Sequence, residues 1–509
     1  MAGSKNIVIC SDGTGNTAIK GRGTNVFKIF EAVDICGHWK NAALRPQVAI
    51  YDDGVGTQGF TPLRLLSGAF GWGLSRNIRR LYTELVRCYE PGDSIYLFGF
   101  SRGAFTVRSL AGFIGSCGIL DARKVPNGQM ESLVAKAYHI YRLTYREDGE
   151  KRQGRKKSQA RAEIFRRQHG VVHDKHAPEG KVDIAFIGVW DTVDAVGLPF
   201  DELTVLLNSI FRFKFPDHVL RNHVQRACHA LSIDDERRTF HPLMWDERNE
   251  KANGWTDRIE QVWFPGAHSN VGGGYPKQGM SLVSLYWMMR KAEAAGARFV
   301  DCDWKLYYDH QNPFDKLYDS RAGLGAYYRY LPRDIGKMCR DNGTIPKIHL
   351  SSIERVIQGS GGYTPGNIPA GCQFVATETP PKNLPDIGPE ITTALGSRGS
   401  LLDDVRPWVY LRHYSNLIFL VVSLAALALI FRDSRTQPGC SDIFSDPFSV
   451  SGLLKLAKCL MLNPTLYITL LCVIAFFYLL GWVARRPMER AFSGFWHALH
   501  ARLSGKLYP

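Results

Sequence analysis

Short apolar runs alternate with stretches of helical periodicity through the first 300 residues of the chain. The apolar runs predict strands at 6–11, 47–51, 94–98, 182–190 and 259–264. Apolar residues at helical spacing predict helices at 75–90, 104–116, 217–232 and 282–295. The run at 94–98 is apolar throughout, as expected of a strand buried on both faces. This alternation is typical of an α/β fold, with a mostly parallel sheet flanked by helices.

The pattern changes twice after residue 300. Over 301–405 the periodicity weakens while Gly, Pro, Tyr and Asn accumulate, which predicts an irregular covering or linking region. Two later stretches, 414–431 and 465–484, contain 18 and 20 residues without a charge, and each is long enough to cross a bilayer as a helix. We therefore expect an α/β domain with a basic insertion, then the covering region, then a two-helix transmembrane anchor (1–300 with 148–181, 301–405 and 406–509).

The tail beyond the second apolar stretch has a different pattern. Over 487–503 the large apolar residues fall on one helical face: Met488, Phe492, Phe495, Trp496, Leu499 and Leu503. Such amphipathicity is typical of a helix that lies in the membrane interface, and the alternative is a helix that docks on a partner subunit. The spans also offer a surface through which an oligomer could form.

The net charge of +15 indicates contact with phosphate groups. The two membrane-length stretches favour anionic lipid head groups over nucleic acid as the source of that phosphate. Ten Lys or Arg residues lie within 148–181, which predicts a solvated surface insertion or, alternatively, a basic helix against head groups. Eight basic residues flank the outer ends of the two spans and four lie in the loop between them. By the positive-inside rule both termini and the α/β domain are expected in the cytoplasm.

The 11 cysteines are scattered singly along the chain, without a CxxC pair or a Cys/His cluster. A zinc site or a redox motif is therefore not expected, and the odd number favours a reducing compartment. The N-terminus lacks the apolar stretch and cleavage site of a signal peptide.

The segment Gly99-Phe100-Ser101-Arg102-Gly103 matches the Gly-x-Ser-x-Gly nucleophile elbow. It follows a predicted buried strand directly and precedes a predicted helix. In such a turn the serine has a strained backbone, and Gly99 and Gly103 are needed because a Cβ would clash with nearby backbone. The position predicts Ser101 as a nucleophile, raised above the sheet edge at a helix N-terminus.

A nucleophilic serine needs a base, and the base needs an acid that orients it. Asp191 follows a predicted buried strand and is the preferred acid, with Asp194 as the alternative. His268 lies on a glycine-rich loop after a late strand and is the preferred base, with His241 as the alternative. This chain order, Ser, then Asp, then His, is that of α/β-hydrolases.

The oxyanion formed during acyl transfer needs two N–H donors. We expect one from the backbone of Arg102 and the other from the loop after the first strand, at Gly13 or Thr14. Acidic residues at strand ends could bind a cation, but they are better explained as turn caps: Asp12, Asp52 and Asp53. No metal or other cofactor is expected.

Together these blocks resemble the bacterial and fungal α/β-hydrolase domain long described as uncharacterised, to which one class of type VI secretion phospholipase effectors belongs. The resemblance covers roughly residues 5 to 300 and is carried by blocks at 11–14, 54–57, 99–105, 188–193, 233–238 and 263–275. It implies that Ser101, Asp191 and His268 form a catalytic triad that cleaves acyl esters of membrane glycerophospholipids.

The chain differs from the secreted effectors, because it is shorter and carries its own two-span anchor. We therefore expect a resident, multi-pass enzyme of the bacterial inner (cytoplasmic) membrane rather than a delivered toxin. Two alternatives remain from the sequence. One is an esterase or thioesterase with a soluble substrate, and the other is a catalytically silent membrane sensor or assembly module.

Overall fold

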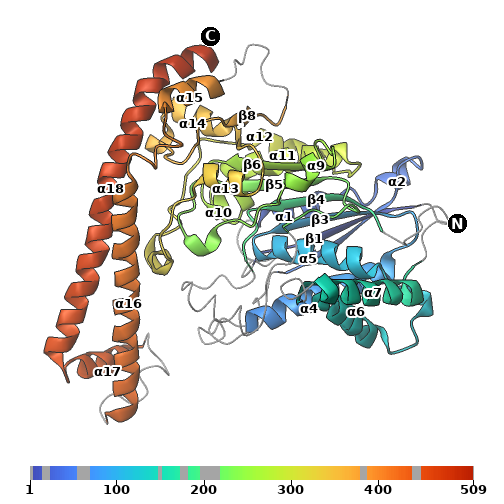
Figure 1. The fold of residues 1–509 in the computed structure, drawn as a ribbon, viewed down its shortest axis with the longest axis horizontal. Helices are drawn as coiled ribbons and strands as arrows, with labels where there is room; N and C mark the ends of the chain where they lie inside the picture. The colour runs from blue at the N-terminus through green and yellow to red at the C-terminus, as the bar shows by residue number, and fades with distance from the viewer. Residues whose placement is uncertain are drawn as a thin grey trace.

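A parallel sheet of eight strands forms the centre of the computed structural model, in the order β2-β1-β3-β4-β5-β6-β7-β8 (Figure 1). The structure describes residues 4–13, 23–53, 69–146, 152–171, 182–194, 218–378, 387–437 and 449–507. The strands are β1 (Asn6–Ser11), β2 (Gln47–Asp52), β3 (Ser94–Phe100), β4 (Ile184–Trp190), β5 (Ala227–Ser232), β6 (Ile259–Phe264), β7 (Lys347–His349) and β8 (Gln373–Val375). Every paired neighbour is parallel, so the carboxyl ends of the strands share one edge. The predicted α/β class is confirmed.

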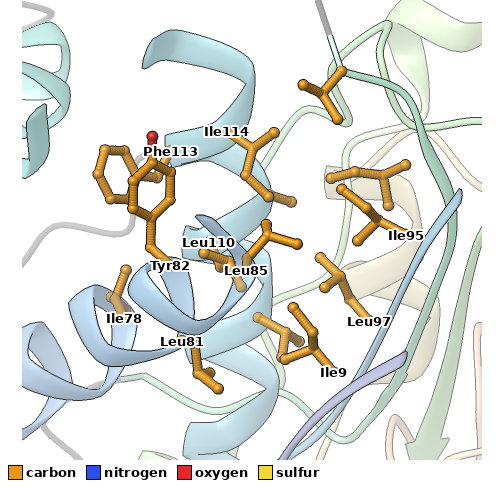
Figure 2. Close-up of a cluster of buried hydrophobic side chains, with 14 of the residues drawn as sticks. Ile9, Ile78, Leu81, Tyr82, Leu85, Ile95, Leu97, Leu110, Phe113 and Ile114 are labelled. Carbon is orange, nitrogen blue, oxygen red and sulfur yellow. The ribbon is translucent and has the colours of Figure 1, made fainter. Parts of the chain in front are cut away.

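Helices cover both faces of the sheet. One face packs against α4 (Ala69–Cys88) and α5 (Arg102–Cys117), and α6 (Met130–Arg146) and α7 (Arg152–His169) pack on these two helices. Figure 2 shows part of this layer, where Leu85 of α4 and Leu110 of α5 meet Leu97 of β3. The other face packs against α1 (Asn25–Ala32), α11 (Gly279–Ala294) and α12 (Asp301–Asp309). Because β3 lies between both layers, its apolar residues have no solvent-facing side, as its unbroken apolar run predicted.

The described part of the basic insertion is mostly the helix α7. Ala162 and Phe165 on one side of this helix are buried in the core, whereas Arg161 and Arg167 are exposed. The segment is thus a surface helix of the α/β domain, with its basic side in solvent.

One predicted helix is wrong. Residues 227–232 of the stretch predicted as the helix 217–232 form the buried strand β5, and residue 217 lies outside the described residues. The sequence Ala-Cys-His-Ala-Leu-Ser is short and buried on both faces, and periodicity alone cannot distinguish such a strand from a buried helix.

Residues 301–405 continue the same sheet. They contribute β7 and β8 together with α13 (Ile335–Asp341), α14 (Ser351–Ile357) and α15 (Gly388–Leu395). Strands of three residues are too short for a visible alternation, which explains why the sequence predicted only irregular structure there. The short elements elsewhere are α2 (Gly37–Lys40), α9 (Arg248–Ala252), α10 (His268–Gly272), η1 (Ala122–Lys124), η3 (Arg238–Phe240), η4 (Gly323–Tyr327) and η5 (Ser360–Gly362).

The C-terminal region forms two long apolar helices, α16 (Arg406–Thr436) and α18 (Pro464–Leu507), which lie side by side (Figure 1). A shorter helix, α17 (Val450–Leu460), lies at their far end. Length and composition make α16 and α18 candidates for membrane spans. Helix α18 continues through Pro487, so the predicted tail helix is an extension of the second span.

The apolar face of that tail is covered by the chain itself. Trp496, Leu499 and Leu503 are buried in a cluster with Ile353 and Ile357 of α14. The Trp496 indole also donates to the carbonyl of Pro365 (Nε1–O 2.8 Å). Because this face already packs on protein, the expected interfacial helix at 487–503 is corrected to a helix that docks on the α/β domain.

Candidate active site

Ser101 lies in a strained turn between β3 and α5. Its backbone has φ 57° and ψ −120°, in the left-handed half of the map that residues with a Cβ rarely adopt. The Ser101 amide donates to the carbonyl of Trp190 (3.0 Å), so the turn is joined to the end of β4. The strain and the position at the carboxyl edge of the sheet are those of a nucleophile elbow.

The two glycines of the elbow are required by close backbone contacts. A Cβ on Gly103 would lie 2.0 Å from the carbonyl oxygen of Ser11 at the end of β1. A Cβ on Gly99 would lie 2.6 Å from the Cα of Ala104 in the first turn of α5. Both distances are far below van der Waals contact, so the turn can form only with glycine at these positions.

His268 and Asp191 form a buried hydrogen-bonded pair. Asp191 follows β4, and its carboxylate Oδ2 lies 2.7 Å from Nδ1 of His268 at the start of α10. The backbone amide and hydroxyl of Ser232 also donate to the Asp191 carboxylate (3.0 and 3.1 Å). The alternative base, His241, places its ring Nε2 3.0 Å from the Leu331 carbonyl oxygen instead. The preferred acid and base of the sequence are therefore the ones that meet.

Arg333 is a member of this site that the sequence did not predict. Its guanidinium donates to both carboxylate oxygens of Asp191 (2.7 and 2.9 Å) and is completely buried. It also donates to the carbonyl oxygens of Ser232 (2.6 Å) and Phe240 (2.5 Å). Burial alone would raise the pKa of Asp191, but the charge and hydrogen bonds of Arg333, with those of His268, hold it well below its usual range. Asp191 is therefore a carboxylate at neutral pH.

The imidazole of His268 is enclosed by two aromatic rings. Phe100, the residue before Ser101, has its ring centroid 4.6 Å from that of His268, and Phe240 approaches edge-on at 5.0 Å. Burial lowers the pKa of His268, and the hydrogen bond to Asp191 opposes this shift only in part. The ring is therefore neutral near pH 7, with Nδ1 oriented by Asp191, as a general base requires.

Phe100 precedes Ser101 in the chain and its ring contacts His268, so the elbow and the imidazole lie at the same edge of the sheet. Ser101 is 7% exposed and His268 is 5% exposed. Within the described residues, no hydrogen bond joins the Ser101 hydroxyl to the imidazole. Hydrogen bonds of this kind are often long before a substrate binds.

The first expected oxyanion donor, Arg102, lies at the start of α5. Arg102 is the first residue of that helix, where backbone N–H groups point toward the elbow. The amide of Gly13 donates to its neighbour's carboxylate, Asp12 Oδ1 (2.6 Å), so it is already engaged in this conformation. Thr14 lies outside the described residues.

The carboxylates considered for a cation have protein partners. Asp12 accepts from the hydroxyls of Thr24 and Tyr51 (both 2.7 Å), and Asp52 accepts from the amide of Asn77 (2.9 Å). In the described part of the chain, no group of three or more His, Cys, Asp or Glu residues is arranged to hold a metal ion.

Comparison with known proteins agrees with this geometry. Residues 5–291 match the family described as "T6SS, Phospholipase effector Tle1-like, catalytic domain", which is more than half of the chain. The chain belongs to this family. The Tle1-like match contains the elbow, Asp191 and His268, whereas Arg333 and the C-terminal helices lie beyond it.

Two relatives of the Tle1-like chain have no assigned function. An uncharacterised protein of Saccharomyces cerevisiae is 30% identical over 252 residues, which is 47% of this chain and 32% of the yeast protein. The chain thus matches about a third of the length of that relative. The crystal structure of an uncharacterised protein from Pseudomonas aeruginosa is 18% identical, covers 60% of this chain and 49% of the other, and has a TM-score of 0.36.

Proposed function

We propose that the protein is a membrane-anchored serine hydrolase that cleaves acyl esters of phospholipids. The observation that carries the proposal is the strained Ser101 elbow beside the buried His268–Asp191 pair, in a chain of the Tle1-like phospholipase family. Strain at Ser101 is expected where a side chain must be held for chemistry. A neutral imidazole with a carboxylate on Nδ1 supplies the base.

The reaction follows from these roles. His268 Nε2 takes the proton of the Ser101 hydroxyl as the serine oxygen attacks the ester carbonyl. Collapse of the tetrahedral intermediate breaks the ester bond, and the imidazolium returns the proton to the leaving lysolipid alkoxide. Water then gives a proton to His268 and attacks the acyl-enzyme. The second tetrahedral intermediate collapses, the fatty acid is released, and His268 returns the proton to the Ser101 oxygen. The Arg102 amide stabilises the oxyanion in both steps.

The C-terminal helices supply the proposed anchor. Apolar side chains such as Val421 and Leu427 on α16 and Leu471 and Phe476 on α18 are exposed over half their surface. Exposed apolar helices of this length are stable when lipid covers them. We place the anchor in a cytoplasmic membrane, with the α/β domain and both termini in the cytoplasm, where the basic surface favours anionic lipids.

The test is hydrolysis of defined phospholipids by the full chain in vesicles of phosphatidylethanolamine and phosphatidylglycerol. We expect lysolipid and fatty acid from the wild type, none from Ser101→Ala, and normal activity from Ser132→Ala, which changes an exposed serine. A fluorophosphonate should label the wild type and not Ser101→Ala. Phospholipid hydrolysis that survives in Ser101→Ala would refute the mechanism. Failure of the probe to label Ser101 would favour a silent sensor module, and activity on a soluble ester alone would favour the soluble-substrate alternative.

A further inference from the structure

Residues 323–328 form a short apolar projection beside α16, which we call the lip. It contains η4 and ends at Tyr328. Leu324 at its tip is 86% exposed. Exposure of one large apolar side chain is common, but an apolar tip beside a candidate membrane span is a candidate contact with lipid.

Polar contacts join the lip and the residues on either side of it to the helix pair. Asn416 of α16 donates to the carbonyl of Ala326 (3.2 Å) and accepts from the amide of Tyr330 (2.7 Å). On the other side, Asp319 pairs with Arg485 of α18 (3.4 Å). The lip therefore has a defined height along α16 and α18.

Aromatic residues mark where a bilayer surface would cross the helices. Trp408, Tyr410 and Tyr414 are exposed in the first turns of α16, and the exposed Trp482 of α18 follows Gly481, which faces Ser415 of α16. Trp and Tyr at the ends of apolar helices are typical of the membrane–water boundary.

The lip reaches past this boundary. The ring of Tyr327 lies 5.2 Å from that of Phe419, which is five residues into the uncharged stretch that begins at Tyr414. Five residues of helix advance about 8 Å along the axis. The ring of Tyr327 is therefore level with the region between head groups and acyl chains, which is roughly 5–10 Å deep.

A continuous aromatic wall joins the lip to the catalytic histidine. The ring of Tyr328 lies 5.3 Å from that of Phe240, and Phe240 lies 5.0 Å from His268. Arg237 covers Phe240 (3.4 Å to the ring centroid) and pairs with Asp235, so this wall is held in place. Tyr328 and Phe240 thus offer an acyl chain raised from the bilayer at the lip a line of aromatic rings that leads to His268.

We propose that the lip inserts into the surface of the bilayer that holds α16 and α18 and passes lipid to the site along Tyr328 and Phe240. This inference rests on the proposed function, because it takes both the anchor and the hydrolase as given. The partner of the lip is the lipid bilayer itself. The contacts described above fix the lip in that position without any change in the fold.

The first test separates lipid access from chemistry. We expect Leu324→Asp to lower hydrolysis of vesicle phospholipid by about tenfold or more, because a charge opposes insertion, while hydrolysis of p-nitrophenyl butyrate changes by less than about twofold. Trp39→Asp is the matched control, because Trp39 is 77% exposed on α2 at the other side of the molecule (Figure 1) and should change neither rate. Equal loss on both substrates, or no loss on vesicles, would overturn the proposal.

The second test does not depend on activity. p-Benzoylphenylalanine replaces Leu324, Trp39 or, on the outer face of α16, Leu424, in Ser101→Ala chains reconstituted in nanodiscs of phosphatidylethanolamine and phosphatidylglycerol. We expect crosslinks to lipid from positions 324 and 424 and none from 39. Crosslinks from 424 alone would overturn the lip and leave the anchor, and crosslinks from neither would overturn both. A crosslink from position 324 to a second copy of the chain would also overturn the proposed insertion of the lip. If position 324 crosslinks to lipid but the wild type hydrolyses no phospholipid, the membrane contact of the lip is supported and only the proposed hydrolase function is refuted.

Discussion

Replacement of Arg333 by methionine tests whether the segment beyond the Tle1-like match supports the proposed chemistry. Methionine keeps much of the side-chain volume and removes the charge and all four hydrogen bonds, two to Asp191 and one each to the carbonyls of Ser232 and Phe240. Asp191 would keep only its bonds from His268 and Ser232. A fully buried carboxylate would then lack a compensating cation.

The expected size of the effect follows from that loss. Removing one partner of a buried ion pair typically costs about 3–5 kcal/mol, so the free energy of unfolding should fall by about that amount. The carboxylate of Asp191, no longer balanced by Arg333, should raise the pKa of His268. A less firmly held imidazole should lower kcat/KM by about tenfold to a hundredfold.

The assay combines chemical denaturation with the pH dependence of kcat/KM for p-nitrophenyl butyrate. Neutral His268 is the base, so activity rises as pH rises through the His268 pKa, and this limb should move to higher pH in Arg333→Met. Arg333→Lys keeps the positive charge but cannot bond both carboxylate oxygens as a guanidinium does. It should therefore restore the position of the acid limb more fully than the free energy of unfolding. Arg258→Met is the control, because Arg258 makes a similar buried pair with Glu250. This pair lies beside the start of β6, whereas His268 follows the carboxyl end of that strand.

Two results would refute the reasoning. One is a pH profile in Arg333→Met that does not move while stability falls as it does in Arg258→Met, which would make Arg333 purely structural. The other concerns Asp191→Asn, whose neutral amide needs no cation. If Arg333→Met destabilises the Asp191→Asn protein as much as it destabilises the wild type, the two residues are not coupled.

Three further predictions follow from the site and its supports. Gly103→Ala should abolish activity and destabilise the fold by about 3 kcal/mol or more in thermal unfolding, because its Cβ would meet the Ser11 carbonyl at 2.0 Å; a stable, active variant would contradict the elbow. The acid limb of wild-type kcat/KM should have its midpoint below the usual 6.5, because burial lowers the pKa of His268, and a midpoint above 7 would contradict this. Trp496→Ala should cost about 3–5 kcal/mol, because a fully buried indole and its bond to Pro365 are lost; exposed Trp482→Ala should cost much less in the same denaturation series.

The parts of the fold that the sequence could predict depend on local physics. Five strands of the sheet and the helices on either side of the elbow have apolar runs or spacing long enough to show their period. The elbow was visible because its chemistry needs glycine, serine and glycine within five residues. Asp191 and His268 were found because strand ends in a parallel sheet converge on one edge, a rule that needs only chain order.

Arg333 could not be found in this way. It lies 142 residues from Asp191 and 65 from His268, in a stretch where neither helical nor strand periodicity is visible. An arginine in an irregular, polar segment is most often exposed, so the residue type did not indicate a buried partner for Asp191. Only the folded chain places this guanidinium on a buried carboxylate, because the segment that contains Arg333 lies over the end of β5 and donates to the carbonyl of Ser232.

The tail of α18 shows a different limit of prediction from the sequence. Its observed packing also links the two long helices to the active site. An amphipathic helix has the same sequence pattern whether its apolar face meets lipid or protein, because both remove the same surface from water. Here the apolar face packs on α14. The 44 residues of α18 therefore form one continuous helix from the candidate span to the α/β domain. The same domain also holds α16 through His413 and Asn416, which bond the backbone at Tyr330, three residues before Arg333. A membrane that fixes the tilt of these two helices would therefore also fix the height of the lip and the position of Arg333. Under the proposed function, the anchor orients the active site as well as concentrating it at the bilayer.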